Sequence, residues 1–323
     1  MLSRHSHVAL AAALVVHGIA VAQTTDLAAP LHKAQQALDR GDYNAAFAEY
    51  RQKAEHDANH LAEFSLALFF REGWGRPKDP VAACQWFEKA AAGKLPAAEH
   101  FLADCLVDGT HRAPDPAKAA YWYQQAAKDG HSISLCSLAA LYVTGRGVAR
   151  DREKGLALCR GIAQQGNVPA MVRIGRLLLE GETTQQNLTE AYAWFEQAAQ
   201  RGAAEALYNL GIMNRDGLGR SRNLEIARSL FESAAAQGYI PAYFPTASLY
   251  FNAPPDADSD RPRADDLAKA YLWLSATARR SKESAEVAAA EEMIGKTKQI
   301  MPATWIPDLN RELDRYLNQH PVP

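Results

Sequence analysis

Four cysteines are the residues of this 323-residue chain with the clearest chemistry. They are Cys84, Cys105, Cys136 and Cys159. An even number of cysteines predicts disulfides in an oxidising compartment. The first two lie level across a predicted turn at residues 94–95, and the last two lie nearly level across a turn near residues 147–148. A bridge also requires that the side chains face each other, so the alternative is four buried thiols.

Other groups with chemical potential give weaker signals. Gly-x-Gly segments such as Gly73-Trp74-Gly75 resemble the start of a phosphate loop, but they lack its third glycine and indicate helix-capping turns. His56 and His60 are four residues apart, a spacing that is typical of a solvated helix face when it stands alone. The sequence has no G-x-S-x-G, H-E-x-x-H, C-x-x-C or S-x-x-K motif. We therefore expect no catalytic residues, no cofactor and no metal site, and the protein is not expected to be an enzyme.

The first residues predict a signal peptide at 1–22. Arg4 gives a positive start, an apolar run follows over residues 8–16, and Ala20-Val21-Ala22 matches a small-x-small cleavage site. The mature chain would begin at Gln23 and lie in the periplasm or be secreted, with no membrane span after cleavage. The alternative is an N-terminal anchor or a buried helix.

The net charge is −2 and there is no basic run, so nucleic acid is not an expected partner.

Three residue series with a period of 36 determine the architecture that holds these groups. One series is of alanine pairs, one of glycines, and one of large apolar residues. The alanine series is Ala90-Ala91, Ala126-Ala127, Ile162-Ala163, Ala198-Ala199 and Ala234-Ala235. The glycine series is Gly73, Gly109, Gly145, Gly181 and Gly217, and the third series is Trp86, Trp122, Leu158, Trp194 and Leu230. One small unit is therefore repeated along the chain.

Each unit is predicted to be a pair of antiparallel amphipathic helices. In residues 205–238, apolar residues recur at helical spacing up to Gly217, where a glycine can adopt the left-handed cap. A polar turn follows, and a second apolar series containing Phe231 runs to Gly238. Neither helix can bury its apolar stripe alone, so each unit needs its neighbours.

The pattern resembles the Sel-one-like repeat (SLR), a relative of the tetratricopeptide repeat. The motif A-x-x-W-F-x-x-A-A-x-x-G is met by Ala191, Trp194, Phe195, Ala198, Ala199 and Gly202. The third repeat departs from it, with Leu158-Cys159 where others have Trp-Phe or Trp-Tyr. The resemblance covers roughly residues 60–280 and implies an all-α fold, a right-handed α-solenoid of antiparallel helix pairs.

The expected organisation has four parts. Residues 1–22 are the signal peptide and residues 23–60 form an N-terminal tetratricopeptide-like helix pair. Residues 61–283 are the repeats, with a loop insertion at 252–264, and residues 284–323 form C-terminal capping helices.

The resemblance implies a concave face lined by the first helix of each pair. That face is expected to bind a peptide, with a site formed by Phe64, Arg71, Arg176, Tyr208, Ile212, Arg215, Phe244 and Phe251. Aromatic residues and arginine are enriched at interface hot spots. The expected function is a scaffold or adaptor for a protein or peptide partner. The alternative, argued only from relatives, is a β-lactamase-like or cell-wall-binding protein of the secreted cysteine-rich type, which a serine or metal cluster in the folded groove would favour.

Overall fold

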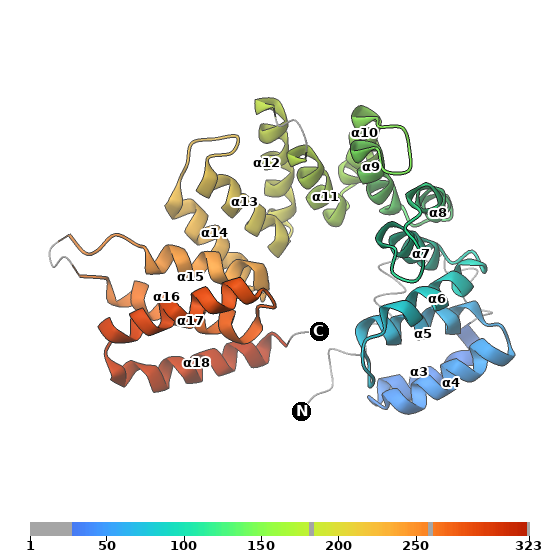
Figure 1. Ribbon diagram of the computed structural model, residues 1–323, viewed down its shortest axis with the longest axis horizontal. Coiled ribbons are helices and arrows are strands. Elements are labelled where there is room, and N and C mark those ends of the chain that lie inside the picture. Colours follow the sequence, from blue (N-terminus) through green and yellow to red (C-terminus); the bar gives the residue numbers. More distant parts are fainter. Residues whose placement is uncertain (1–27, 181–183, 258–260, 322–323) are drawn as a thin grey trace. The chain divides into compact units, whose positions relative to one another are not determined.

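The computed structural model describes residues 28–180, 184–257 and 261–321, and within them it is all-α. The described residues form sixteen α-helices and no strand, and successive helices pack as antiparallel pairs (Figure 1). The expected α-solenoid class is confirmed. The predicted signal peptide, residues 1–22, and the predicted mature start at Gln23 lie outside the described residues. The chain divides into two compact units, Met1–Ala170 and Met171–Pro323.

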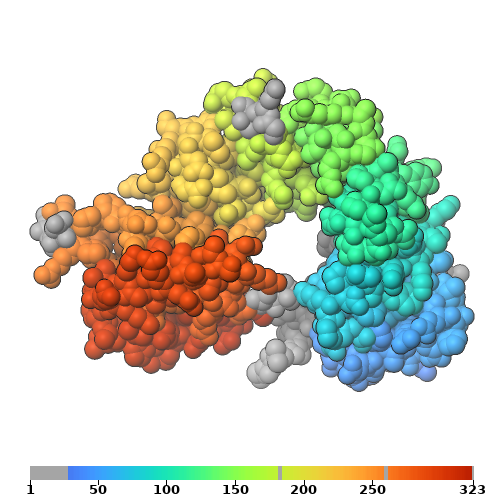
Figure 2. Space-filling model, in the orientation of Figure 1, coloured from blue at the N-terminus to red at the C-terminus, as the bar shows by residue number. Residues whose placement is uncertain are grey.

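Unit 1 contains four complete helix pairs after a short 3-10 turn, η1 (Ala29–Leu31). Its helices are α3 (His32–Asp39), α4 (Tyr43–His56), α5 (His60–Glu72), α6 (Pro80–Ala91), α7 (Pro96–Asp108), α8 (Pro116–Lys128), α9 (Ser134–Thr144) and α10 (Arg152–Gln164). Each helix packs against the next one in sequence. In the space-filling view the colours follow one another in chain order through this unit, as expected where each pair contacts its neighbours (Figure 2).

Unit 2 continues the same pairing, and the division between the units falls within α11 (Val168–Leu179). Its further helices are α12 (Gln185–Gln200), α13 (Ala204–Asp216), α14 (Leu224–Ala236), α15 (Tyr243–Phe251), α16 (Ala264–Arg280), α17 (Ser284–Ile300) and α18 (Ile306–Gln319), with 3-10 turns η2 (Ile240–Ala242) and η3 (Ala303–Trp305). The expected loop at 252–264 connects α15 to α16, and its residues 258–260 lie outside the described residues. None of the described helices is long and apolar enough to cross a membrane.

Helix ends follow the 36-residue period. The first helices α5, α7, α9 and α13 each end at a glycine with a left-handed backbone, at Gly73, Gly109, Gly145 and Gly217. The second helices α6, α8, α10 and α14 each begin after an N-cap side chain that accepts a hydrogen bond from the backbone three residues on. These caps are Asp79, Asp115, Asp151 and Asn223. Each such cap stabilises a helix by about 1 kcal/mol, so the turn between the helices of a pair is specified locally.

A second regularity lies in the core, where two positions 23 residues apart contact each other inside several of the helix pairs. Phe64 contacts Phe87 with ring centroids 5.8 Å apart, and Tyr208 contacts Phe231 at 5.7 Å. His100 and Tyr123 stand at the same positions, 5.4 Å apart. A side chain of the first helix therefore packs against an aromatic ring of the second at equivalent positions in these repeats.

Small residues on the first helix make room for that ring. A Cβ atom added to Gly175 or Gly211 would lie 2.7 or 2.6 Å from the ring of Phe195 or Phe231. Contacts that short force a neighbour to move. The two glycines thus stand mid-helix because the backbone approaches an aromatic ring of the second helix.

Candidate functional site

Both predicted cysteine pairs form disulfides. Cys84 is bonded to Cys105 with Cα atoms 5.8 Å apart, and Cys136 is bonded to Cys159 with Cα atoms 4.4 Å apart. The first bridge joins α6 to α7 and the second joins α9 to α10. The pairing predicted from the turns is confirmed, and the four cysteines are therefore not free thiols.

The two expected binding residues of unit 1 are in different situations. Phe64 is fully buried at 0% exposure, so its place on a binding face is wrong. The reason is its register, since it is the first-helix member of the core contact with Phe87. Arg71 is partly exposed, and its guanidinium lies 4.1 Å from the ring centroid of Phe101 while its Nε donates to Glu72 at 2.6 Å.

Tyr208 of unit 2 stands at the same repeat position as Phe64, four repeats further along the chain. Its ring lies 5.7 Å from Phe231 and 5.4 Å from Tyr239, and burial raises the pKa of its hydroxyl. Tyr208 is therefore only partly exposed and contributes to the contact between the two helices of its pair. The sequence predicts Tyr208 on the peptide-binding face, and its contact with Phe231 corrects that prediction in part, because the ring also packs inside the helix pair.

The two arginines of the expected site are surface residues of unit 2. The side chain of Arg176 is 49% exposed and its Nη1 lies 3.3 Å from Glu205 Oε1. The side chain of Arg215 is 41% exposed and donates two hydrogen bonds to Asp216, at 2.7 and 2.8 Å. That hydrogen bonding lowers the pKa of Asp216, so the carboxylate is held in its charged form.

Tyr239 and Ile212 complete the surface beside these arginines. Both are partly exposed. Burial, with Glu205 and Tyr208 nearby, raises the pKa of Tyr239 to about 12, so its phenol stays protonated and able to donate a hydrogen bond. We refer to these five residues as the arginine–tyrosine surface: Arg176, Glu205, Ile212, Arg215 and Tyr239.

Phe244 and Phe251, the last two expected binding residues, lie mainly against the C-terminal helices. Both pack on a small core cluster formed by Ala247, Leu274 and Ala290. Each retains partial exposure, so each is an edge residue of the contact among α15, α16 and α17. The expected site residues therefore fall into three groups. Phe64 is a core residue, Phe244 and Phe251 lie at the edge of a helix contact, and Arg176 and Arg215 are exposed.

A serine–histidine–aspartate group does converge in unit 1. Ser134 Oγ lies 2.9 Å from Nδ1 of His100, whose Nε2 lies 3.6 Å from Asp104 Oδ2. His131 Nδ1 also contacts the same hydroxyl, at 2.7 Å. A nucleophilic serine must reach a substrate carbonyl, but Ser134 is 0% exposed. The arrangement therefore has the residue types of a hydrolase triad without an accessible nucleophile.

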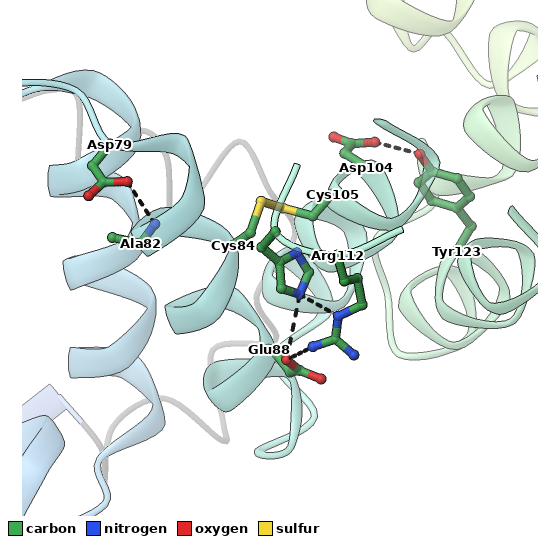
Figure 3. Close-up of a disulfide and its surroundings, with 9 residues drawn as sticks. Asp79, Ala82, Cys84, Glu88, Asp104, Cys105, Arg112 and Tyr123 are labelled. Atoms are coloured by element: carbon green, nitrogen blue, oxygen red, sulfur yellow. Dashed lines mark hydrogen bonds and ion pairs between the residues drawn. A yellow bond between two sulfur atoms is a disulfide. The ribbon is translucent and has the colours of Figure 1, made fainter. Parts of the chain in front are cut away.

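A further polar cluster surrounds the first disulfide and was not expected from the sequence. Cys84, Cys105 and His111 bring one potential ligand atom each to within 4.8 Å of one another. Figure 3 shows the bridge beside Glu88 and Arg112, which form an ion pair with each other. Burial lowers the pKa of His111, which favours its neutral form. The spacing of Cys105 and His111 matches no common metal motif, so sequence alone offered no signal.

The chain matches the family model described as Sel1 repeat at residues 60–94, 96–131, 132–167, 168–202 and 204–239. No curated protein matches it. Among solved structures it is similar to a protective antigen of uropathogenic Escherichia coli strains that displays an SLR fold, with 23% identity over 93% of this chain and a TM-score of 0.60. The chain spans 62% of the length of that structure. It is also similar to a Sel1 repeat protein from Oxalobacter formigenes, with 24% identity, 77% of this chain and 99% of that chain covered, and a TM-score of 0.59. These likenesses show the fold, and the five matched repeats establish that the chain belongs to the Sel1 repeat family.

Proposed function

We propose that this protein is an exported, non-enzymatic scaffold that holds a protein or peptide partner on the arginine–tyrosine surface of unit 2. The observation that carries the proposal is the exposure of two arginines on successive first helices, Arg176 on α11 and Arg215 on α13, together with the partly exposed Tyr239 and Ile212. Repeat arrays of this kind mostly build binding surfaces. Arginine and tyrosine each combine buried area with directed hydrogen bonds.

The charges of this surface favour a segment that carries carboxylates. Each arginine is already engaged by one acidic side chain of the protein, Glu205 or Asp216, at the surface. Exposed ion pairs of this kind contribute little to stability, about 0–1 kcal/mol, so exchanging the intramolecular carboxylate for a partner's costs little. The neutral phenol of Tyr239, close to Arg176 and Glu205, supplies a hydrogen-bond donor.

Export is supported by the two disulfides. Such bridges persist in oxidising compartments and are rare in the cytosol. We propose that residues 1–22 are removed and that the mature chain begins at Gln23 in the periplasm. Sequencing the N-terminus of the fractionated protein tests this. A chain that retains Met1 in the cytoplasmic fraction would contradict it.

The β-lactamase-like alternative finds no support in the serine cluster. Ser134 is fully buried and is contacted by two imidazoles, so no substrate carbonyl can approach its hydroxyl in this structure. The cluster is better explained as a hydrogen-bond network that links α7 to the start of α9. It is not proposed as an active site.

The binding proposal is tested with two arginine variants and a matched control. The full chain, the Arg176→Ala/Arg215→Ala variant and the Arg279→Ala variant are immobilised and exposed to periplasmic extract. Arg279 is a suitable control because its side chain is 50% exposed and ion-paired to Asp314 in the same unit. Tyr208 is left unchanged because its truncation would disturb the contact with Phe231.

We expect the double variant to lose captured partner by at least about tenfold, as when hot-spot residues are truncated. The control should capture as much as the unmodified chain, and all three should have the same circular dichroism. Equal capture by the double variant and the unmodified chain would place the binding surface elsewhere.

A further inference from the structure

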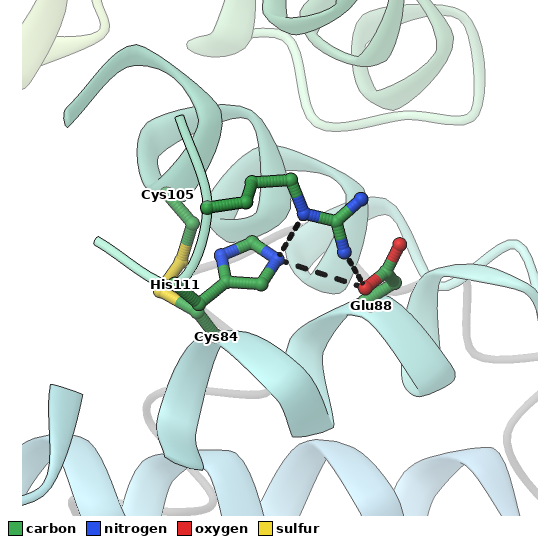
Figure 4. A network of polar contacts seen from close by, with 5 residues as sticks. Cys84, Glu88, Cys105 and His111 are labelled. Atoms are coloured by element: carbon green, nitrogen blue, oxygen red, sulfur yellow. Dashed lines mark hydrogen bonds and ion pairs between the residues drawn. A yellow bond between two sulfur atoms is a disulfide. The ribbon is translucent and has the colours of Figure 1, made fainter. Parts of the chain in front are cut away.

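One histidine nitrogen next to the first disulfide is buried and has no hydrogen-bond partner among the described residues. The side chain of His111 is 3% exposed. Its Nε2 accepts from Arg112 Nε at 2.8 Å and lies 3.6 Å from Glu88 Oε2, whereas its Nδ1 is unpaired. Figure 4 shows this second nitrogen on the side of the ring that faces the disulfide. A buried polar atom without a partner costs free energy, so its position calls for an explanation.

We propose that the Cys84–Cys105 disulfide covers a latent zinc site, in which the reduced sulfurs of both cysteines and Nδ1 of His111 bind one Zn²⁺. All three donor groups already lie within 4.8 Å of one another. Two thiolates on one tetrahedral zinc lie about 3.8 Å apart, because each Zn–S bond is about 2.3 Å long. Opening the S–S bond to that spacing requires only a small displacement of α6 and α7.

The charges of the site suit a divalent ion. Two thiolates neutralise Zn²⁺, and a neutral imidazole adds no charge, so the buried group as a whole carries none. Thiolate and imidazole are the donors that zinc prefers. With Nδ1 on the metal, the neutral ring carries its proton on Nε2, so Nε2 gives up the hydrogen bond that it accepts from Arg112. Glu88, whose Oε2 lies 3.6 Å from Nε2, can then accept a hydrogen bond from Nε2–H and orient the ring, as carboxylates commonly do behind a metal-bound histidine. Three protein donors leave the fourth position to water or to an external ligand.

The site forms only after a two-electron reduction. With a phosphine as reductant, the S–S bond breaks, the phosphine becomes a phosphine oxide by taking an oxygen from water, and each sulfur receives one proton. Zinc binding then releases both thiol protons to solvent. In this way the metal would restore the link between α6 and α7 that the disulfide provides in its oxidised state.

The second disulfide is a control within the same chain. Its sulfurs lie near backbone carbonyl oxygens, with Cys136 Sγ 3.8 Å from the oxygen of Cys159 and Cys159 Sγ 3.7 Å from that of Ala170. Among the residues that the structure describes, no histidine or carboxylate joins this pair to make a three-ligand group. Reduction there is expected to give two thiols that bind zinc weakly.

The test measures zinc on the full chain. The protein is reduced with a phosphine, separated from the reductant without oxygen, incubated with Zn²⁺ and desalted. Zinc per chain is then determined, and affinity is measured by competition with a chromophoric chelator. The same measurements are made on the oxidised protein and on the His111→Ala, Cys84→Ser/Cys105→Ser and Cys136→Ser/Cys159→Ser variants.

We expect one zinc per reduced chain and none on the oxidised chain. The Cys136→Ser/Cys159→Ser variant should keep the zinc, and the Cys84→Ser/Cys105→Ser variant should lose it. His111→Ala should weaken binding by at least about tenfold. Its disulfide stays intact in the oxidised state, where circular dichroism reports the fold.

A second readout does not depend on any variant. Zinc should slow the alkylation of Cys84 and Cys105 in the reduced chain and leave the alkylation of the buried Cys136 and Cys159 unchanged, as mapped by mass spectrometry with and without the metal. Absence of zinc from the reduced chain, equal affinity of the His111→Ala variant, or zinc-dependent protection of Cys136 and Cys159 in place of the first pair would each overturn the proposal.

Discussion

The two disulfides of unit 1 have nearly the same sequence separation, 21 and 23 residues, but they lie in different kinds of place. Cys84–Cys105 joins the second helix of one repeat to the first helix of the next. Cys136–Cys159 joins the two helices of a single repeat. The first bridge therefore connects neighbouring repeats, whereas the second supports the interior of one.

The second bridge occupies a position where other repeats have aromatic side chains. Its 23-residue separation is that of the contacts Phe64–Phe87 and Tyr208–Phe231. Both of its cysteines are 0% exposed, as expected at core positions. The departure of the third repeat from the family motif, Leu158-Cys159 in place of Trp-Phe, is thus a replacement of an aromatic contact by a covalent one.

The first bridge lies in polar surroundings. Its cysteines are 4% and 6% exposed, and His111, Glu88 and Arg112 lie beside it. The comparison teaches that similar loop lengths do not imply the same role. One bridge substitutes for packing, while the other lies among the ionisable side chains of His111, Glu88 and Arg112.

The largest effect is expected from removing the second bridge. Cys136→Ala with Cys159→Ala should lower the free energy of unfolding of unit 1 by about 4–5 kcal/mol. About 3 kcal/mol comes from the lost cross-link and the rest from the under-filled core. Chemical denaturation followed by circular dichroism measures the change.

A replacement variant sharpens this prediction. Cys136→Val with Cys159→Phe copies the residues at the same positions of the next repeat, Val172 and Phe195, both buried. It should recover about 1–2 kcal/mol relative to the alanine pair, because a ring refills the core without the cross-link. A replacement variant that is less stable than the alanine pair would show that the third repeat cannot accept the aromatic contact.

The second largest effect is expected at the first bridge. Cys84→Ala with Cys105→Ala should cost about 3 kcal/mol, mainly by releasing a loop of similar length in the unfolded chain. Less packing is lost because the bridge lies nearer the surface. If this pair proved costlier than the second, the repeat boundary, and not the interior of the third repeat, would limit the stability of unit 1.

The pH response of unit 1 should depend on Glu99, which lies on the same helix as Cys105. Glu99 is 2% exposed, its Oε2 has no hydrogen-bond partner among the described residues, and burial raises its pKa to about 7, with Asp129 adding to the effect. Its ordinary pKa is 4.5. The folded state therefore binds a proton more tightly than the unfolded state does.

The sign follows from this difference. The protonated carboxyl of Glu99 stabilises the folded state. This contribution to the free energy of unfolding is fully present below pH 4.5 and is lost as pH rises through about 7. Glu99→Gln should remove most of this dependence and make the protein more stable at pH 8, by roughly 2–3 kcal/mol. Denaturation at pH 5 and pH 8 measures the difference, with the surface variant Glu196→Gln as control. Parallel pH profiles for the Glu99 variant and the unmodified chain would contradict the assignment.

Much of the fold follows from local signals in the sequence. The period of 36 indicates the helix pairs, glycines such as Gly217 mark helix ends, and the symmetric placement of cysteines about two turns predicts the bridges. These features succeed because they depend on local backbone conformation and on spacing within one repeat unit.

The candidate site was less predictable because it depends on which face of a helix a residue occupies. Phe64 and Tyr208 lie on first helices, as expected, but their side chains pack against the second helix of the pair. That direction is set by the 23-residue core contact, which becomes visible only when Phe87 and Phe231 are in place. The position of His111 beside the first disulfide could not be predicted for another reason. The segment after α7 brings it close to the disulfide, and its spacing from Cys105 matches no common metal motif.

The smallest effect is expected from the ion pair beside the first bridge. Arg112 and Glu88 have side chains 39% and 40% exposed, and exposed pairs of this kind contribute about 0–1 kcal/mol. Arg112→Ala should therefore cost about 0.5 kcal/mol or less in the oxidised protein, because water can replace the guanidinium at both Glu88 and Nε2 of His111. Thermal unfolding at low and high salt measures this, and the small difference from the unmodified chain should shrink further as salt screens the pair. A cost above about 1.5 kcal/mol that persists at high salt would mean that Arg112 fixes the turn carrying His111, and the polar surroundings of the first bridge would then be as structural as the packed surroundings of the second.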